Sequence, residues 1–269
     1  MRSAITISLV PQAAGGPFVF WDDLAAACES AAALGFDAIE IFPPAAEAID
    51  RPALRELLSR HSLKVAAFGT GGGWVIHQWH LLHADPTIRA QARKFIHAII
   101  EVAGEFGAPA IIGSMQGRVE GDREQALGWL REALTEFGQA AARHGVALLL
   151  EPLNRYETNV FNRVPDAADF LDTLPVTNVK ILADLFHMNI EEASIADAFR
   201  AAARHLGHVH FADSNRRAVG FGHTAMAPIM AALREMGYTG YLSGELLPLP
   251  DSYAAADQTA KAFNELVSY

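Results

Sequence analysis

The sequence contains one cysteine, Cys28, among its 269 residues. A single cysteine cannot form an intramolecular disulfide, so the chain is expected to fold without cross-links, as is typical of cytoplasmic proteins. Cys28 lies in an alanine-rich stretch that predicts a helix. A buried and unreactive thiol is expected there.

Long apolar runs and an excess of positive charge are also missing. No stretch reaches the ~18 consecutive apolar residues that a membrane-spanning helix needs. The apolar start of the chain ends at Pro11, which is too early for a signal peptide. The formal net charge is −10, which disfavours binding to a phosphate backbone. We therefore expect neither a membrane nor a nucleic acid as a partner.

The sequence does contain a recurring glycine-plus-apolar pattern. Hydrophobic residues make up 51% of the chain, enough for a sizeable core. Five helix-like stretches end at a glycine that is followed by a short apolar run, and these glycines are Gly35, Gly107, Gly145, Gly207 and Gly237. Glycine is the usual left-handed cap of a helix, and a short apolar run after it is typical of a buried parallel strand. The pattern predicts alternating helices and parallel strands.

Eight strand-then-helix units can be counted. The predicted strands are Ala4–Leu9, Ala38–Phe42, Lys64–Gly69, Ala110–Gly113, Ala147–Glu151, Val179–Asp184, His208–Asp213 and Tyr241–Leu246. The predicted helices are Asp22–Leu34, Pro52–His61, Pro86–Phe106, Arg123–His144, Pro165–Leu174, Ile195–His205, Ala227–Met236 and Tyr253–Val267. Strict alternation predicts a parallel sheet. Eight units within about 260 residues predict an α/β protein, a single-domain (β/α)₈ TIM barrel over residues 1–269.

Four titratable residues lie at the ends of four successive predicted strands: Glu151, Asp184, His210 and Glu245. The carboxyl ends of barrel strands form one face, and chemistry is carried out there. Three carboxylates and one imidazole form a hard, oxygen-rich donor set that suits Mn²⁺, Mg²⁺ or Co²⁺ better than structural zinc. The alternative is that strand-end polar residues only face solvent or pair with basic groups. Four on successive strands favour the metal site.

Segments around these residues resemble a known family. Glu151-Pro-Leu-Asn-Arg-Tyr-Glu157-Thr-Asn-Val-Phe-Asn resembles the strand-five signature of ketose 3-epimerases of the D-tagatose 3-epimerase type. Asp184-Leu-Phe-His187 resembles their strand-six motif, and His208-Val-His210 with the later Ser-Asn-Arg216 resembles strand seven and its loop. The resemblance covers essentially the whole chain. By it, the chain is identified as a member of the sugar isomerase/epimerase-like, xylose isomerase-like TIM-barrel superfamily.

The resemblance implies a metal-dependent isomerase that acts on a free ketose as a homodimer or homotetramer. One divalent ion per chain, Mn²⁺ in the first place and Mg²⁺ or Co²⁺ otherwise, would be held by Glu151, Asp184, His210 and Glu245. Glu151 and Glu245 would also be the acid and base, while the substrate would contact Glu157, His187 and Arg216. Epimerisation at C3 removes a proton next to a carbonyl and returns one on the opposite face, so it needs two positioned carboxylates.

Other functions fit parts of the same pattern. Isomerisation or epimerisation of a sugar phosphate, a hydroxypyruvate-type isomerisation and dehydration of an inosose all begin with proton abstraction next to a carbonyl. An AP endonuclease on this barrel would use a trinuclear zinc cluster, but the third and fourth predicted strands end in Phe68-Gly69 and Gly113-Ser114, which supply no such ligands. A non-catalytic sugar-binding barrel is disfavoured by the complete ligand set.

Some signals stay open at this level. Glu40 ends the second predicted strand and could line the pocket or orient a neighbour, whereas His208 is expected to be a core histidine. The Gly71–Gly73 loop could cradle a phosphate, but a flexible lid that closes Trp74 over the sugar is favoured. Arg118 could bind a substrate phosphate, although a solvated arginine is favoured.

Overall fold

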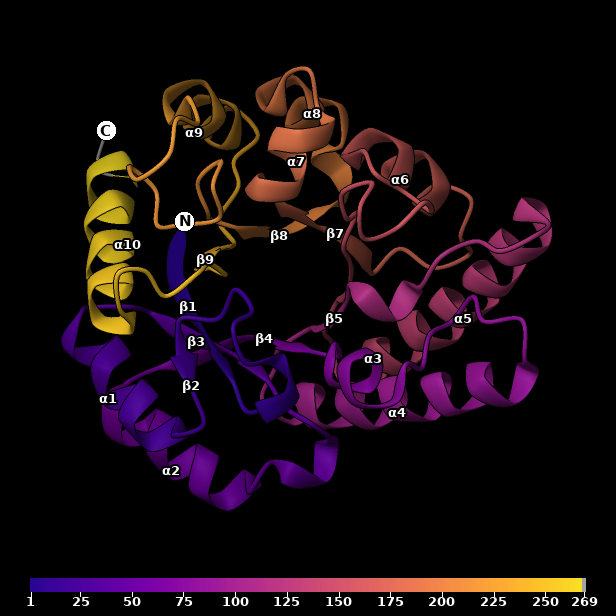
Figure 1. The fold of residues 1–269 in the computed structure, drawn as a ribbon, viewed down its shortest axis with the longest axis horizontal. Helices are drawn as coiled ribbons and strands as arrows, with labels where there is room; N and C mark the ends of the chain where they lie inside the picture. Colours follow the sequence, from indigo (N-terminus) through magenta and orange to yellow (C-terminus); the bar gives the residue numbers. More distant parts are fainter. Residues whose placement is uncertain (268–269) are drawn as a thin grey trace.

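Eight parallel strands close into a barrel in the computed structural model, which describes residues 1–267 (Figure 1). The ring contains β1 (Arg2–Ser8), β3 (Ala38–Phe42), β4 (Lys64–Gly69), β5 (Ala110–Ile112), β6 (Leu148–Leu150), β7 (Val179–Asp184), β8 (Leu206–His210) and β9 (Tyr241–Gly244). Each strand pairs with the next, and the ring closes because β1 pairs with β9. The predicted α/β barrel is therefore confirmed.

One additional strand was not predicted. The two-residue β2 (Phe20–Trp21) pairs with Ile7 and Ser8 of β1, beyond the point where the pairing of β1 with β9 stops at Ile5. It lies in the long connection after β1, which also contains the short 3₁₀ helix η1 (Pro11–Ala13). This connection is thus tied to the top of the barrel and contributes to the wall of the cavity described below.

The helices surround the barrel (Figure 1). They are α1 (Leu24–Ala33), α2 (Arg51–His61), α3 (Gly72–His77), α4 (Pro86–Glu105), α5 (Arg123–Arg143), α6 (Val164–Leu171), α7 (Leu185–Glu191), α8 (Ile195–Ala201), α9 (Met226–Glu235) and α10 (Ser252–Val267). Further 3₁₀ helices are η2 (Ala46–Ala48), η3 (Ser114–Gln116) and η4 (Ala203–His205). Asp23, Asp50, Asp85 and Asp122 each accept a bond from a first-turn N–H, which caps the helix that follows.

Apolar side chains fill the space on both sides of the sheet. The main core lies between the strands and the surrounding helices. Inside the barrel, Phe42, Ala67, Ile111, Leu149 and Leu182 form a second cluster, and Ala4, Ala38, Ala66 and Tyr241 form a third. The barrel interior is therefore packed with side chains, and the open space lies above it, at the carboxyl ends of the strands.

Two local predictions were wrong, and one helix was not predicted. The Gly71–Gly73 segment is not an open loop: it leads into helix α3, where a Cβ on Gly72 would lie 2.6 Å from the Pro43 carbonyl oxygen and one on Gly73 2.6 Å from Met115 Sδ. These glycines allow close packing. The predicted strand His208–Asp213 ends at His210, because the backbone after it turns into a loop. Helix α7 was not expected directly after Asp184.

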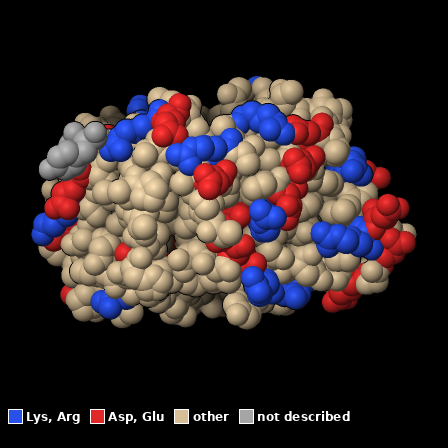
Figure 2. All heavy atoms as spheres, turned by 90° about the horizontal axis from the view of Figure 1, so that it is seen from above, with Lys and Arg blue, Asp and Glu red and all other residues tan. Residues whose placement is uncertain are grey.

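No helix within residues 1–267 has both the length and the apolar character needed to cross a membrane. On the side of the molecule that Figure 2 displays, basic and acidic side chains are interspersed.

Candidate metal centre

The four residues predicted to bind metal meet at the carboxyl ends of β6 to β9. Asp184 and His210 are the last residues of β7 and β8, and they are opposite each other in the register of the two strands. Glu151 directly follows β6, and Glu245 directly follows β9. All four are buried, and one ligand atom from each lies within 4.8 Å of the others. The structure thus brings this predicted set together.

The spacing of these atoms fits ligands that share one cation. Nδ1 of His210 lies 3.4 Å from Glu245 Oε2, 3.5 Å from Glu151 Oε1 and 3.6 Å from Asp184 Oδ2. These distances exceed the ~2.7–3.2 Å of an N–H···O hydrogen bond, and Nδ1 is buried without a hydrogen-bond partner. Two ligands bound to one ion at ~2.1 Å each lie roughly 3.0–3.5 Å apart. The residues present therefore fit a divalent metal.

Local backbone structure positions these carboxylates. Oδ1 of Asp184 accepts a hydrogen bond from Phe186 N at 2.7 Å and so caps α7, which turns Oδ2 toward the cluster. Glu151 fills space left by Gly113, because a Cβ on Gly113 would collide with Glu151 Oε2. Cap and glycine thus fix two of the three carboxylates.

The cluster changes the pKa of its members in opposite directions. Burial raises the pKa of Glu151, and the negative charge of Glu245 adds to this effect. Burial would also raise the pKa of Glu245, but the positive charges of His210 and Arg216 lower it. Burial by itself would lower the pKa of His210, yet the carboxylates of Glu245 and Glu40 raise it well above its ordinary value. Such opposed shifts within one pocket are typical of acid–base pairs.

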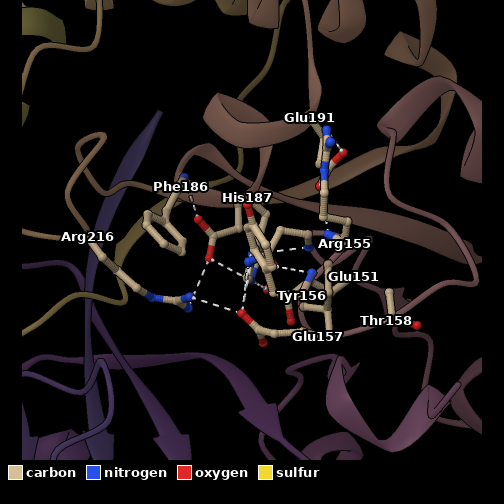
Figure 3. Close-up of polar contacts among 12 residues, drawn as sticks. Glu151, Arg155, Tyr156, Glu157, Thr158, Phe186, His187, Glu191 and Arg216 are labelled. Carbon is tan, nitrogen blue, oxygen red and sulfur yellow. Dashed lines mark hydrogen bonds and ion pairs between the residues drawn. The ribbon is translucent and has the colours of Figure 1, made fainter.

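The three predicted substrate contacts lie beside this cluster (Figure 3). His187 is on α7 with 2% of its side chain exposed, and its Nε2 is 3.6 Å from Asp184 Oδ2. Arg216, in the loop after β8, contacts Glu245 closely and lies 3.3 Å from Asp184 Oδ2. Glu157 lies in the loop after β6, and 46% of its side chain is exposed. Together with Glu151 and Glu245, they line one cavity of about 400 Å³.

The sequence reasoning missed Asn154, which connects two of these residues. Its Nδ2 lies 2.7 Å from His187 Nδ1 and donates to Glu157 Oε1 at 2.9 Å. The amide group can only donate at this atom, so Nδ1 of His187 accepts and Nε2 carries the proton. His187 thus presents an N–H donor to the cavity. The sequence feature that could have indicated Asn154 is its position inside the Glu151–Glu157 segment.

Asp213 was missed as well, and it organises the loop that carries Arg216. Its buried carboxylate accepts hydrogen bonds from Ser214 N, Gly220 N and Thr224 N at 2.7–2.9 Å. The backbone of Arg216 is left-handed, with φ +57°, and its carbonyl accepts from Leu247 N at 2.7 Å. A non-glycine residue in this conformation needs support from its surroundings.

The residues that the sequence left open are placed clearly. Glu40 and His208 are buried inside the barrel, and with His210 they form the only other group of three potential metal ligands in residues 1–267. Arg118 is exposed, donates to the Tyr156 carbonyl oxygen at 3.3 Å and does not line the cavity. It is therefore not positioned to bind a substrate phosphate there.

Sequence comparison agrees with this geometry. Residues 28–264 match the family described as the xylose isomerase-like TIM barrel. The chain belongs to this family. Members with curated functions include the D-psicose 3-epimerase of Ruminiclostridium cellulolyticum, 32% identical over 223 residues that cover 79% of this chain and 74% of that protein. The L-ribulose 3-epimerase of Methylomonas sp. is 30% identical over 81% of this chain and 77% of its own length.

A solved structure shows the same barrel. The crystal structure of D-allulose 3-epimerase from Methylomonas sp. has a TM-score of 0.80, with 25% identity and 99% of each chain covered. These relatives of the present chain are ketose 3-epimerases.

Proposed function

We propose that this protein is a divalent-metal ketose 3-epimerase that inverts C3 of a free ketose. The observation that carries the proposal is that ligand atoms of Glu151, Asp184, His210 and Glu245 lie within 4.8 Å of one another. Glu151 and Glu245 of this set also line the cavity, together with His187 and Arg216. The relatives named above support the choice of reaction. A divalent cation held by these four residues would act as a Lewis acid that stabilises the negative charge developing beside the C2 carbonyl.

The residues of the chain would move the proton. Glu151 and Glu245 follow β6 and β9, with β7 and β8 between them in the ring, so they approach the cavity from different strands. One carboxylate removes the C3 proton from one face, and the other donates a proton to the opposite face. Each passes between its ionised and protonated form, and the overall proton count is unchanged. A positioned carboxylate contributes about 10²–10⁴-fold in such a role.

The remaining polar groups would orient the substrate. The N–H at Nε2 of His187 can donate to a substrate oxygen. Arg216 can neutralise charge on the oxygen side of the intermediate. Glu157 can accept from a substrate hydroxyl at the mouth of the cavity, where it is partly exposed.

The charges around the cavity favour an uncharged substrate. Its lining residues from β1 to β5 and their loops include no charged side chain. Within residues 1–267, Arg216 is the one arginine or lysine that lines the cavity, and it already faces Asp184 and Glu245. A substrate phosphate would meet mainly carboxylates. We therefore propose a free ketose rather than a sugar phosphate.

Metal identity, location and assembly belong to the same proposal. Three carboxylates and one imidazole favour Mn²⁺, with Mg²⁺ or Co²⁺ as alternatives. A cytoplasmic location is consistent with the one cysteine of the sequence. A homodimer or homotetramer is carried over from the resemblance. Metal analysis of the purified protein tests the identity of the metal, and light scattering tests the oligomeric state.

Proton NMR in D₂O tests the reaction. Free and phosphorylated ketoses are incubated with protein and Mn²⁺, with and without a chelator. We expect metal-dependent deuterium uptake at C3 and appearance of the C3 diastereomer for a free ketose. Exchange at C1 would instead indicate an isomerase, and loss of water a dehydratase. Absence of exchange with every sugar, in protein shown to contain metal, would contradict the proposal.

A further inference from the structure

Beneath the metal centre, Glu40 connects two histidines inside the barrel. Its Oε1 lies 2.8 Å from His210 Nε2, and its Oε2 lies 2.7 Å from His208 Nε2. Glu40 is fully buried and His208 is 2% exposed. No arginine or lysine within residues 1–267 forms an ion pair with Glu40, so the two imidazoles are its charged or polar partners there. A buried carboxylate needs such donors to offset its desolvation.

These contacts cross the interior of the barrel. Glu40 is on β3, whereas both histidines are on β8, and β1 and β9 lie between these strands in the ring. In register, Glu40 is opposite Thr6 of β1, and His208 is opposite Leu182 of β7. The Glu40–histidine contacts are therefore side-chain contacts between opposite parts of the sheet. They are not a by-product of strand pairing.

The geometry decides which nitrogen of His210 is free. An ionised carboxylate can only accept hydrogen bonds, so Nε2 of His210 must carry the proton that Glu40 accepts. In the neutral ring, Nδ1 then has the lone pair. Nδ1 is the atom that faces Glu151, Asp184 and Glu245 at 3.4–3.6 Å without a hydrogen-bond partner. This arrangement suits a nitrogen that binds a cation.

We propose that Glu40 is a positioning residue that makes His210 an Nδ1 ligand of the metal, and that His208 holds Glu40 in place. His208 Nε2 lies 2.7 Å from the second carboxylate oxygen, so Glu40 cannot rotate away from His210 without also losing this buried contact. This inference rests on the proposed function only in requiring that the wild-type protein binds a divalent ion. Carboxylates that orient a metal-ligating histidine typically contribute 10–100-fold in metal affinity.

Metal binding, measured apart from activity, tests the proposal. Apo protein is titrated with MnCl₂ by calorimetry or by EPR of free Mn²⁺, for the wild type, Glu40→Gln and Glu192→Gln. We expect Glu40→Gln to weaken Mn²⁺ binding about 10–100-fold, because its amide NH₂ cannot accept from both histidines. Glu192→Gln is the matched control: the Glu192 side chain is 2% exposed, and it interacts with Val164 N and Arg163, away from the metal ligands.

Two further variants, at His208, test the proposal even if Glu40→Gln does not fold. His208→Leu removes the donor to Glu40 and should weaken Mn²⁺ binding less than loss of Glu40 itself. His208→Gln retains a donor and should restore part of the affinity. In ¹⁵N-histidine spectra of the Mg²⁺-loaded protein, His210 should be protonated at Nε2. Wild-type protein that binds no metal would contradict the proposed function. If the wild type binds Mn²⁺ and both Glu40→Gln and His208→Leu bind it with an affinity within threefold of the wild type, this inference is overturned.

Discussion

Gly113 lies against the carboxylate of Glu151 with no space for a side chain between them, since a Cβ on Gly113 would collide with Glu151 Oε2. Replacing Gly113 by Ala should displace this carboxylate from the cluster. We expect turnover and metal affinity each to fall by at least tenfold, while circular dichroism shows a folded barrel. The expectation follows from the sensitivity of catalysis to small displacements of reacting groups.

Gly128→Ala is the matched control for this variant. Gly128 is on α5, and a Cβ there would meet nothing within 4 Å. Alanine has the higher helix propensity, so the control should raise stability by up to about 1 kcal/mol and leave turnover unchanged. Wild-type activity of the Gly113 variant would show that Glu151 tolerates another position.

Glu245→Gln should strongly reduce turnover but leave ketose binding detectable. Glutamine has nearly the same shape as glutamate, but it cannot take up the C3 proton. We expect kcat to fall about 10²–10⁴-fold, with ketose binding still detectable by saturation-transfer NMR. Glu157→Gln is the comparison, because this partly exposed residue is placed to bind substrate and should mainly raise KM. If both variants lost the same share of kcat, Glu245 would not have a distinct role in proton transfer.

Asn154→Ala should disturb substrate binding without affecting the metal. Asn154 lies within hydrogen-bond distance of both His187 Nδ1 and Glu157 Oε1. Without it, the His187 ring can adopt either tautomer and the Glu157 side chain can adopt other rotamers. Loss of such buried bonds costs about 1–3 kcal/mol, which predicts an about 5- to 150-fold lower kcat/KM. Steady-state kinetics and metal content are the measurements.

Asn159→Ala provides the control in the same loop. Asn159 is exposed and bonds with the backbone of Val119, and it does not line the cavity. Its kcat/KM should stay within threefold of wild type. A reduced metal content in Asn154→Ala would mean that the residue supports the metal centre rather than the substrate contacts.

The barrel could be predicted because its signals are local. A glycine after five of the helix-like stretches and a short apolar run after each of these glycines are encoded in a few consecutive residues, and parallel pairing brings strand ends to one face. This reasoning also placed Glu151, Asp184, His210 and Glu245 together. Helices α3 and α7 lack such signals. Helix α3 has six residues and no capping side chain, and α7 begins directly after β7, with Asp184 serving both elements.

Contacts across the barrel were out of reach for a different reason. Which side of β3 faces the interior depends on how the ring closes, so the sequence could not show that Glu40 meets His208 and His210. The role of Asn154 depends on the fold of the loop after β6. Arg216 needs a left-handed backbone that Asp213 supports through the loop amides, and neither feature has a local sequence signature.

His80 should make the stability of the fold depend on pH. Its ring packs 5.5 Å from Trp74 and 5.0 Å from His83, and Nδ1 is buried without a hydrogen-bond partner. Burial lowers the pKa of His80 to about 4, and the nearby charge of His83 adds to this effect. In the unfolded chain, the pKa of a histidine is about 6.5. The unfolded state therefore binds a proton more readily than the folded state between these two values.

The sign of the effect follows from this difference. Above pH 6.5 His80 is neutral in both states, and its stabilising contribution is fully present. As the pH falls from 6.5 toward 4, the unfolded state gains a proton that the folded state does not, so the free energy of unfolding decreases. Leucine has no group that could bind this proton, so the variant His80→Leu should not show this part of the pH dependence.

Urea unfolding of the wild type and His80→Leu at pH 7 and pH 4.5 tests this. Between these pH values, the free energy of unfolding of the wild type should fall by about 2 kcal/mol more than that of the variant. The control variant His223→Gln changes an exposed histidine and should lose as much unfolding free energy as the wild type. Equal losses in wild type and His80→Leu would mean that the packing around His80 opens to water before the protein unfolds.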